Sequence, residues 1–207
     1  VVSMTAQLQS IAWSASQSIS VPLESEPGLP HRPPYVPMLI AAEPSKSGFP
    51  PTSLVSDASA LPTPLAIGAT WNPELAASVG AVLAQELTVL GFNLYLGPGL
   101  DVLYTPRPGD PVDLGTATFG SDPFWVGQMG TAYLQGLHQG SEGKLLVAPR
   151  HLPGLGSADR PLEEEVPTVQ KPLEQLKQIE LAPFFAAAAD LPGAEQAADA
   201  FVVTHIR

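Results

Sequence analysis

The spacing of hydrophobic and polar positions changes several times along the chain, and each change predicts a different kind of element. In four segments apolar residues recur every three or four positions, which is the spacing of one face of a helix. The predicted helices span residues 3–20, 73–90, 123–140 and 172–181. Short continuous apolar runs instead predict strands buried on both faces. The predicted strands span residues 37–42, 92–96, 144–148 and 201–205.

The ends of these helices carry local signals. Asn72 and Asp122 each precede a proline, which combines a capping side chain with a residue suited to the first helical position. Gly91 and Gly140 provide stops at the other ends, and Pro183 predicts a break or kink near the last helix. One side of the 73–90 helix is traced by Leu75, Val79, Val82, Leu83, Glu86 and Leu90.

Strands and helices alternate from residue 37 onward, beginning with a strand. This order is typical of right-handed βαβ units and a parallel sheet. We therefore predict an α/β fold of the (β/α)8 TIM-barrel type over residues 37–207. A complete barrel needs roughly 250 residues, so the 207-residue chain is expected to form a partial barrel. Residues 1–36 are expected to form an N-terminal helix and a proline-rich linker without regular structure.

Composition narrows the classes of function. Nine basic residues against 20 acidic ones give a formal charge of −11, which disfavours nucleic acid and anionic membranes as partners. No apolar run approaches the roughly 20 residues that span a bilayer. Cysteine is absent, and the four histidines have no metal-binding spacing. We therefore expect neither a metal ion nor a cofactor.

The 24 prolines and the low content of charged residues favour an extracellular or cell-envelope protein, although a cytoplasmic one is not excluded. The first residues lack the charged and apolar regions of a signal peptide. A signal peptide is therefore expected to have been removed or never to have been present.

Polar side chains gather directly after the predicted strands. They are Glu43, Asp101, Arg150, His151 and His205. The carboxyl ends of parallel strands meet at one face of the fold, where ligands bind. We therefore expect one cleft to collect all five, with groups that hydrogen-bond a neutral polar ligand.

Each candidate also has a simpler interpretation. Asp101 can satisfy the amides of its own turn. Arg150 and His151 can be solvated residues beside a Pro-Gly turn, and His205 can be a hydrogen-bonded core histidine. The acidic run 163–165 is a potential supply of catalytic carboxylates, but charge runs usually mark a solvated face, which is the interpretation we favour.

Several segments form an ordered set of motifs. They are 61–70 (LPTPLAIGAT), 86–102, 119–123 (FGSDP), 150–156 (RHLPGLG) and the strand that ends in His205. Together they resemble glycoside hydrolase family 3, in the branch that includes bacterial β-N-acetylhexosaminidases. The resemblance covers about 37–207 and implies a barrel domain that hydrolyses β-linked sugars or amino sugars with retention. It implies that Asp101, Arg150 and His151 orient sugar hydroxyls, while Glu43 and His205 line the cleft.

The chain departs from the family pattern at positions that bear on catalysis. Glu43 stands where the family has a sugar-binding aspartate, and Ala117 stands where it has a substrate-binding arginine. Arg150 replaces a lysine, which is not an equivalent change at a close polar contact. Pro149 is expected to remove a ladder hydrogen bond from its strand.

The acid/base loop of the family, Asp-Ser-His, corresponds to residues 159–161 (DRP), so its histidine has no counterpart. Asp159 is then the loop acid left near that position. The family's nucleophilic aspartate is expected on a strand beyond Arg207. A retaining mechanism needs two carboxyl groups, so we expect this chain alone to be inactive.

The alternative is a non-catalytic pseudo-glycosidase that serves as a carbohydrate-binding or structural subunit of a cell-envelope assembly. In either case a partial barrel exposes unpaired strand edges. A protein partner that covers those edges is therefore expected, besides the carbohydrate ligand.

Overall fold

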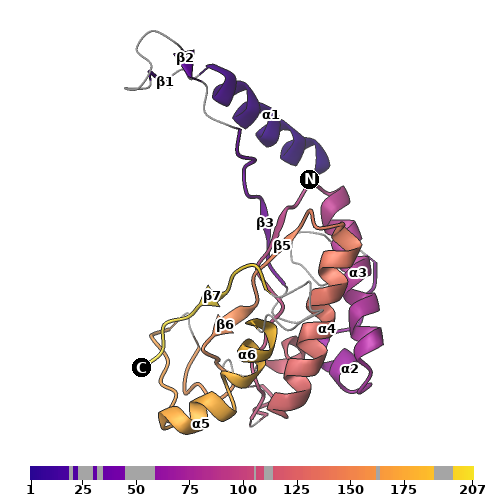
Figure 1. The fold of residues 1–207 in the computed structure, drawn as a ribbon. Coiled ribbons are helices and arrows are strands. Elements are labelled where there is room, and N and C mark those ends of the chain that lie inside the picture. Colours follow the sequence, from indigo (N-terminus) through magenta and orange to yellow (C-terminus); the bar gives the residue numbers. More distant parts are fainter. Residues whose placement is uncertain are drawn as a thin grey trace.

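A computed structural model gives the fold shown in Figure 1. It describes residues 1–18, 21–22, 30–31, 35–44, 59–104, 106–109, 114–161, 164–188 and 198–207. Ile19 and Ser20 at the end of the predicted helix 3–20, and Glu163 of the acidic run, lie outside the described residues.

Four helices begin close to the positions expected from periodicity, whereas two further short helices and a 3₁₀ turn were not predicted. They are α1 Val2–Ser18, α2 Pro64–Gly68, α3 Pro73–Val89, the 3₁₀ turn η1 Gly115–Ala117, α4 Pro123–Ser141, α5 Leu173–Gln178 and α6 Ala182–Ala188. The strands are shorter than expected. They are β1 Val21–Pro22, β2 Pro30–His31, β3 Ala41–Ala42, β4 Leu94–Tyr95, β5 Leu146–Val147, β6 Arg150–Leu152 and β7 Val202–Val203.

The sheet is parallel, as the alternating order predicts. Strands β3, β4 and β5 pair in that order, with Leu94 opposite both Ala41 and Leu146. Strand β6 pairs in parallel with β7. A parallel bridge between Gly99 and Arg150 ties the chain after β4 to β6. The α/β prediction is confirmed, and the described strands form only part of a barrel.

Pro149 lies between β5 and β6 instead of inside one continuous strand. Its carbonyl accepts a hydrogen bond from the Val202 amide at 2.9 Å, so it contributes to the pairing with the β7 segment. The missing proline N–H therefore falls at a break between two strands, where it disturbs the ladder least.

Both predicted helix caps are confirmed. The Asn72 side chain accepts from the amides of Glu74 and Leu75 at 3.0 and 3.3 Å. The Asp122 side chain accepts from the Trp125 amide at 3.0 Å. Gly91 follows α3 with a φ of +87° that an L-residue rarely adopts.

Two helix ends differ from expectation. Helix α4 continues past Gly140 to Ser141, and Glu142 takes the left-handed conformation that terminates it. The helix predicted at 172–181 ends at Gln178, and a separate helix, α6, begins at Ala182. Pro183 therefore lies in the first turn of a new helix, a position it tolerates because no intrahelical donor is lost there.

Helices α3 and α4 pack closely together and cover one side of the sheet (Figure 1). Their contact is formed by small residues: an added Cβ at Gly136 would lie 1.9 Å from the carbonyl oxygen of Ala77. The buried side of α3 consists of Ala76, Val79, Gly80, Leu83, Ala84 and Leu87. Leu75 and Val82, expected on that side, are exposed.

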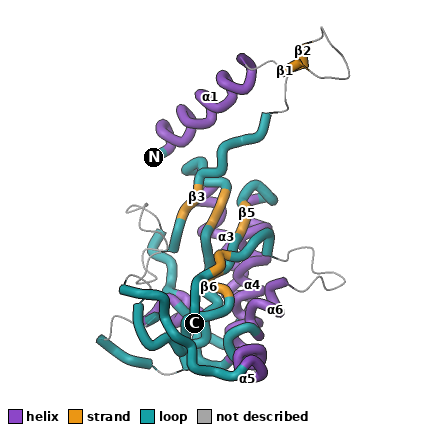
Figure 2. Tube along the Cα trace, turned by 90° about the vertical axis from the view of Figure 1, so that its left-hand side faces the viewer, coloured by secondary structure: helices purple, strands orange, loops and turns teal. Residues whose placement is uncertain are grey.

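Helix α1 extends away from the main body (Figure 2). Thr5 is its one buried residue and donates to the Leu90 carbonyl at 2.8 Å. Gln9 donates to the Met38 carbonyl at 2.8 Å. The linker after α1, expected to be irregular, contains the short antiparallel pair β1–β2. Among the described residues, no helix is long and apolar enough to cross a membrane.

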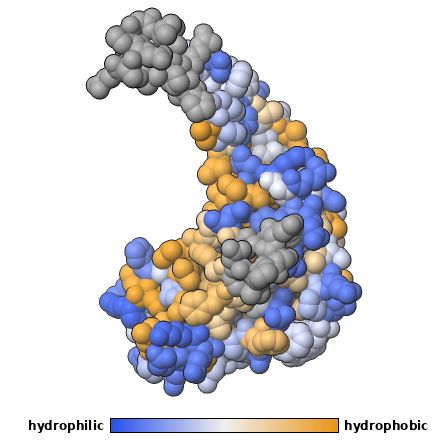
Figure 3. Space-filling model, in the orientation of Figure 1, coloured by the Kyte–Doolittle hydropathy of each residue, from blue (hydrophilic) through white to orange (hydrophobic). Residues whose placement is uncertain are grey.

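The segment before β3 exposes Val36, Met38 and Leu39. Figure 3 shows apolar surface in the region between α1 and the main body. The N-terminal part is thus attached mainly through a few polar contacts, whereas the body has a continuous hydrophobic core.

Candidate functional site

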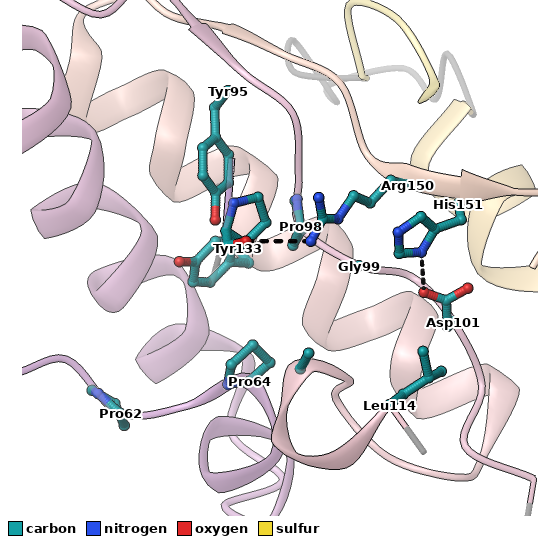
Figure 4. A pocket seen from close by; sticks show the side chains of 12 residues that line it. Pro62, Pro64, Tyr95, Pro98, Gly99, Asp101, Leu114, Tyr133, Arg150 and His151 are labelled. Atoms are coloured by element: carbon teal, nitrogen blue, oxygen red, sulfur yellow. Dashed lines mark hydrogen bonds and ion pairs between the residues drawn. The ribbon is translucent and has the colours of Figure 1, made fainter. Parts of the chain in front are cut away.

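A pocket lies next to the segments that follow the carboxyl ends of β3, β4 and β5 (Figure 4). It is lined by Pro44, Pro62, Pro64, Tyr95, Pro98, Gly99, Asp101, Leu114, Ala117, Tyr133, Arg150 and His151. This is the face at which parallel α/β folds bind ligands. The fold therefore brings three of the five predicted residues, Asp101, Arg150 and His151, to one pocket.

Asp101 is the buried anchor of this pocket, with 2% of its surface exposed. Its Oδ2 lies 2.8 Å from Nδ1 of His151, and its Oδ1 accepts from the Leu155 amide at 2.8 Å. Thr118 donates through Oγ1 to the Asp101 carbonyl at 2.7 Å. Both carboxylate oxygens are engaged, so Asp101 fixes the His151 ring and the following turn.

Arg150 reaches the pocket from β6, in register with Val202 of β7. Its guanidinium donates to the Pro44 carbonyl at 3.3 Å and lies 3.8 Å from Oε2 of Glu43. Glu43 itself is exposed and does not line the pocket. Among the described residues Arg150 therefore has one long carboxylate contact and one backbone contact, and these leave donors of its planar group for a ligand.

Tyr95 and Tyr133 also line the pocket, and sequence reasoning missed them as site residues. Both side chains are buried. Burial raises the pKa of Tyr95 and the pKa of Tyr133. Both hydroxyls are therefore neutral groups near the guanidinium of Arg150. The sequence feature that could have identified them is a tyrosine on the buried side of a predicted element. Tyr95 lies on β4 and Tyr133 on α4.

Ala117 contributes a short apolar wall from η1, opposite Gly99. An added Cβ at Gly99 would lie 3.1 Å from the Ala117 carbonyl oxygen, so the two segments are close. With Leu114 and the prolines, Ala117 makes this side of the pocket apolar. The guanidinium that the resemblance implies at this position is replaced by a methyl group.

His205 is exposed beyond β7 and is not among the residues that line the pocket. The expectation that one cleft collects all five candidates therefore does not hold for the described pocket, because His205 and Glu43 lie outside it. The core interpretation of His205 does not hold either, since its side chain faces solvent.

Asp159 likewise lies outside the pocket lining. Arg160 donates to both of its oxygens, at 3.2 and 2.9 Å, and the Thr168 amide donates to Oδ1 at 2.7 Å. These hydrogen bonds, that of Arg160 first, lower the pKa of Asp159 to about 2. A carboxyl group with this pKa is ionised at neutral pH and a poor proton donor.

Glu164 and Glu165 of the acidic run are exposed, which agrees with a solvated face. Glu165 pairs with Arg160 and with Arg207, the latter at 2.8 Å. Within the described part of the chain, no three acidic or histidine side chains are grouped so as to hold a metal ion.

The profile described as the N-terminal domain of glycosyl hydrolase family 3 matches residues 32–205. A β-hexosaminidase of Hydrogenovibrio crunogenus is 31% identical over 134 residues, which cover 65% of this chain and 34% of that protein. The chain thus spans about a third of the length of this curated relative.

Solved structures agree with that match. A family 3 β-N-acetylglucosaminidase from a Paenibacillus species superposes with a TM-score of 0.78 at 27% identity, covering 99% of this chain and 33% of that one. NagZ from Neisseria gonorrhoeae, in complex with N-trifluoroacetyl-D-glucosamine, superposes with a TM-score of 0.71 at 21% identity. The superposition covers 99% of this chain and 51% of the NagZ chain. At 21% identity this likeness supports the fold alone.

Proposed function

The chain belongs to glycosyl hydrolase family 3, in its β-hexosaminidase-like branch, and on that premise we propose that its pocket binds the terminal sugar of a β-linked amino-sugar chain. The chain is a glycoside hydrolase domain by family. We propose that the described residues recognise the sugar, and that this chain alone does not hydrolyse it.

The arrangement of Asp101, Arg150 and His151 carries this proposal. The contact with Asp101 uses Nδ1 of His151, so Nε2 is the ring nitrogen that can bond a sugar hydroxyl. The guanidinium of Arg150 supplies further donors. The apolar wall of prolines, Leu114 and Ala117 suits the less polar face of a pyranose ring.

Hydrolysis with retention requires a nucleophilic carboxylate and an acid/base group about 5–5.5 Å apart. The described pocket contains one carboxylate, Asp101, and hydrogen bonds already occupy both of its oxygens. Asp159 lies outside the lining and has a lowered pKa. We therefore propose that binding and turnover are separable in this protein.

Binding of N-acetylglucosamine, followed by calorimetry, tests this function. We expect His151→Ala to weaken binding about tenfold or more, because the variant loses a hydrogen bond to the ligand and leaves Asp101 buried without its partner. His205→Ala is the matched control, since it removes an exposed histidine outside the pocket. Equal affinity of the His151→Ala variant and the unaltered protein would refute the proposed site.

A second candidate is a non-catalytic subunit of a cell-envelope assembly, outside the cytoplasm. The methyl group of Ala117 favours it, because a sugar-binding arginine is implied there. The exposed edge strand β7, with Val203 facing solvent, offers a surface for a protein partner. Turnover of a chromogenic β-N-acetylglucosaminide by the isolated protein would exclude this candidate. It would also contradict the proposal that this chain binds the sugar without hydrolysing it.

A further inference from the structure

Three aromatic side chains form a cluster on the surface outside the pocket. Trp71 and Phe124 are exposed over 57% and 64% of their surface. The Trp125 ring lies between them, with edge-to-face contacts at centroid distances of 5.0 Å to Trp71 and 5.6 Å to Phe124. We call Trp71, Phe124 and Trp125 the aromatic platform. Single exposed apolar residues are ordinary, but three mutually ordered rings form a defined surface.

The platform lies at the pocket end of the molecule. Trp71 follows α2, whose first residue, Pro64, lines the pocket. Phe124 and Trp125 belong to the first turn of α4. Figure 1 shows α2 beside the end at which α4 begins. An added Cβ at Gly68 would lie 1.8 Å from the Phe119 carbonyl oxygen, so α2 is packed directly against the chain that leads into α4.

The backbone at Trp71 is unusual for its residue type. Its φ of +54° is in the left-handed region, which bulky side chains rarely adopt. Its amide donates to the Gly68 carbonyl at 3.1 Å, which closes the turn after α2. Glycine or asparagine would occupy this position at lower cost. The large exposed ring is therefore not explained by the requirements of the turn.

Exposed rings of this kind suit the apolar face of a sugar. In a β-linked hexopyranose the axial C–H bonds lie on the faces of the ring and carry partial positive charge. The face of an aromatic ring carries partial negative charge. Aliphatic side chains bury apolar area without this electrostatic match. The three rings carry no charge of their own and therefore suit an uncharged ligand. The carboxylate of Asp122 beside them caps α4 by accepting from the Trp125 amide at 3.0 Å.

We propose that the aromatic platform is a second carbohydrate-binding site, which holds sugar units of a β-linked oligosaccharide away from the pocket. The ligand class rests on the proposed function. The platform adds a dependence on chain length, because a monosaccharide in the pocket does not reach it, whereas a longer chain contacts both surfaces and gains affinity from the second contact.

The experiment compares two probes, N-acetylglucosamine and its β-1,4-linked hexamer, by calorimetry and tryptophan fluorescence. The chain has three tryptophans, and two of them belong to the platform. We expect the double variant Trp71→Ala/Phe124→Ala to bind the hexamer about tenfold or more weakly, with unchanged affinity for the monosaccharide. The variant Trp71→Leu/Phe124→Leu keeps apolar bulk without the rings and is expected to lose hexamer affinity as well.

Trp13→Ala is the matched control. Trp13 is exposed over 51% of its surface and contacts the Tyr35 ring edge-to-face at 5.1 Å, but it lies on α1. The proposal is overturned if the double variant binds the hexamer as the unaltered protein does, if Trp13→Ala weakens it equally, or if the unaltered protein binds the hexamer no more tightly than the monosaccharide. Hexamer binding that depends on the platform, without monosaccharide binding, would instead support the platform and refute the proposed pocket.

Discussion

At the scale of single residues, the partners of an ionisable group decide what it can contribute. Asp101 and Asp159 are both aspartates close to the motifs of the family. Asp101 is buried and orients His151 toward the pocket. Asp159 is held by Arg160, and its pKa falls to about 2. The sequence names both as candidates, and only their contacts separate a buried aspartate in the pocket lining from an aspartate in a surface ion pair.

Glu180 is a buried carboxylate that sequence reasoning did not select. It is 0% exposed, and its Oε1 accepts from Ser157 Oγ at 2.7 Å and from Nζ of Lys171. Gly154 packs against its side chain, where an added Cβ would lie 2.8 Å from the Glu180 Cβ. The turn that contains Leu155, whose amide bonds Asp101, is therefore braced by this ion pair.

We expect Glu180→Leu to lower the free energy of unfolding by about 3–5 kcal/mol, because the variant leaves the ammonium group of Lys171 largely buried without its partner. Urea denaturation measures the change. Glu174→Ala is the control, since its pair with Lys177 is exposed and contributes about 0–1 kcal/mol. Similar losses for the two variants would contradict the structural role of the buried pair.

At the scale of elements, the positions of the helices were easier to predict than the faces that they bury. The start of α3 at Pro73 follows from the Asn72 cap, which is a local signal. Its buried side, however, includes Ala76, Gly80 and Ala84. Small residues let two backbones approach, and this close packing against α4 rotates the larger Leu75 toward solvent. A pattern that counts only large apolar residues misses such a contact.

The α3–α4 contact predicts that replacing a helical glycine by alanine, at Gly136, destabilises the protein. Alanine normally stabilises a helix by about 1 kcal/mol relative to glycine. At Gly136 we expect the opposite, because the added methyl would lie 1.9 Å from the Ala77 carbonyl oxygen and force the helices apart. Thermal unfolding, followed by circular dichroism, measures this. Gln128→Ala on the exposed side of α4 is the control, and a higher melting temperature for Gly136→Ala would refute close packing.

At the scale of the whole molecule, the main body and α1 differ in how they are held. The body has a shared core of α3, α4 and the parallel strands. Helix α1 contributes Thr5 alone to the buried residues. Its apolar positions follow a helical spacing, but Ile11 and Trp13 are exposed. An amphipathic pattern predicts a helix without specifying whether another surface covers it.

We expect removal of residues 1–18 to lower the free energy of unfolding by about 1–3 kcal/mol, because the hydrogen bonds of Thr5 to Leu90 and of Gln9 to Met38 are lost and each contributes about 0.5–1.5 kcal/mol. Leu134→Ala, in the fully buried core, is expected to cost about 2–5 kcal/mol. Chemical denaturation of both variants provides the comparison. A larger loss on truncation than on the core substitution would show that α1 is part of the body's cooperative unit.

The sequence by itself determined the alternation of strands and helices, the caps at Asn72 and Asp122, and the family. These features depend on neighbours within a few residues or on motifs in a fixed order, so they are legible along the chain. It also placed Asp101, Arg150 and His151 at strand ends, where parallel topology brings polar groups together.

Only the tertiary structure decided which candidates share the pocket. The pairing of Gly99 with Arg150 brings Asp101 and His151, 50 residues apart, to 2.8 Å. The same packing buries Tyr95 against Tyr133 and leaves His205 in solvent. Such neighbours depend on strand register and helix contacts between distant segments, which no local spacing encodes. The hydrophobic pattern therefore predicted the elements, and the contacts between them determined the site.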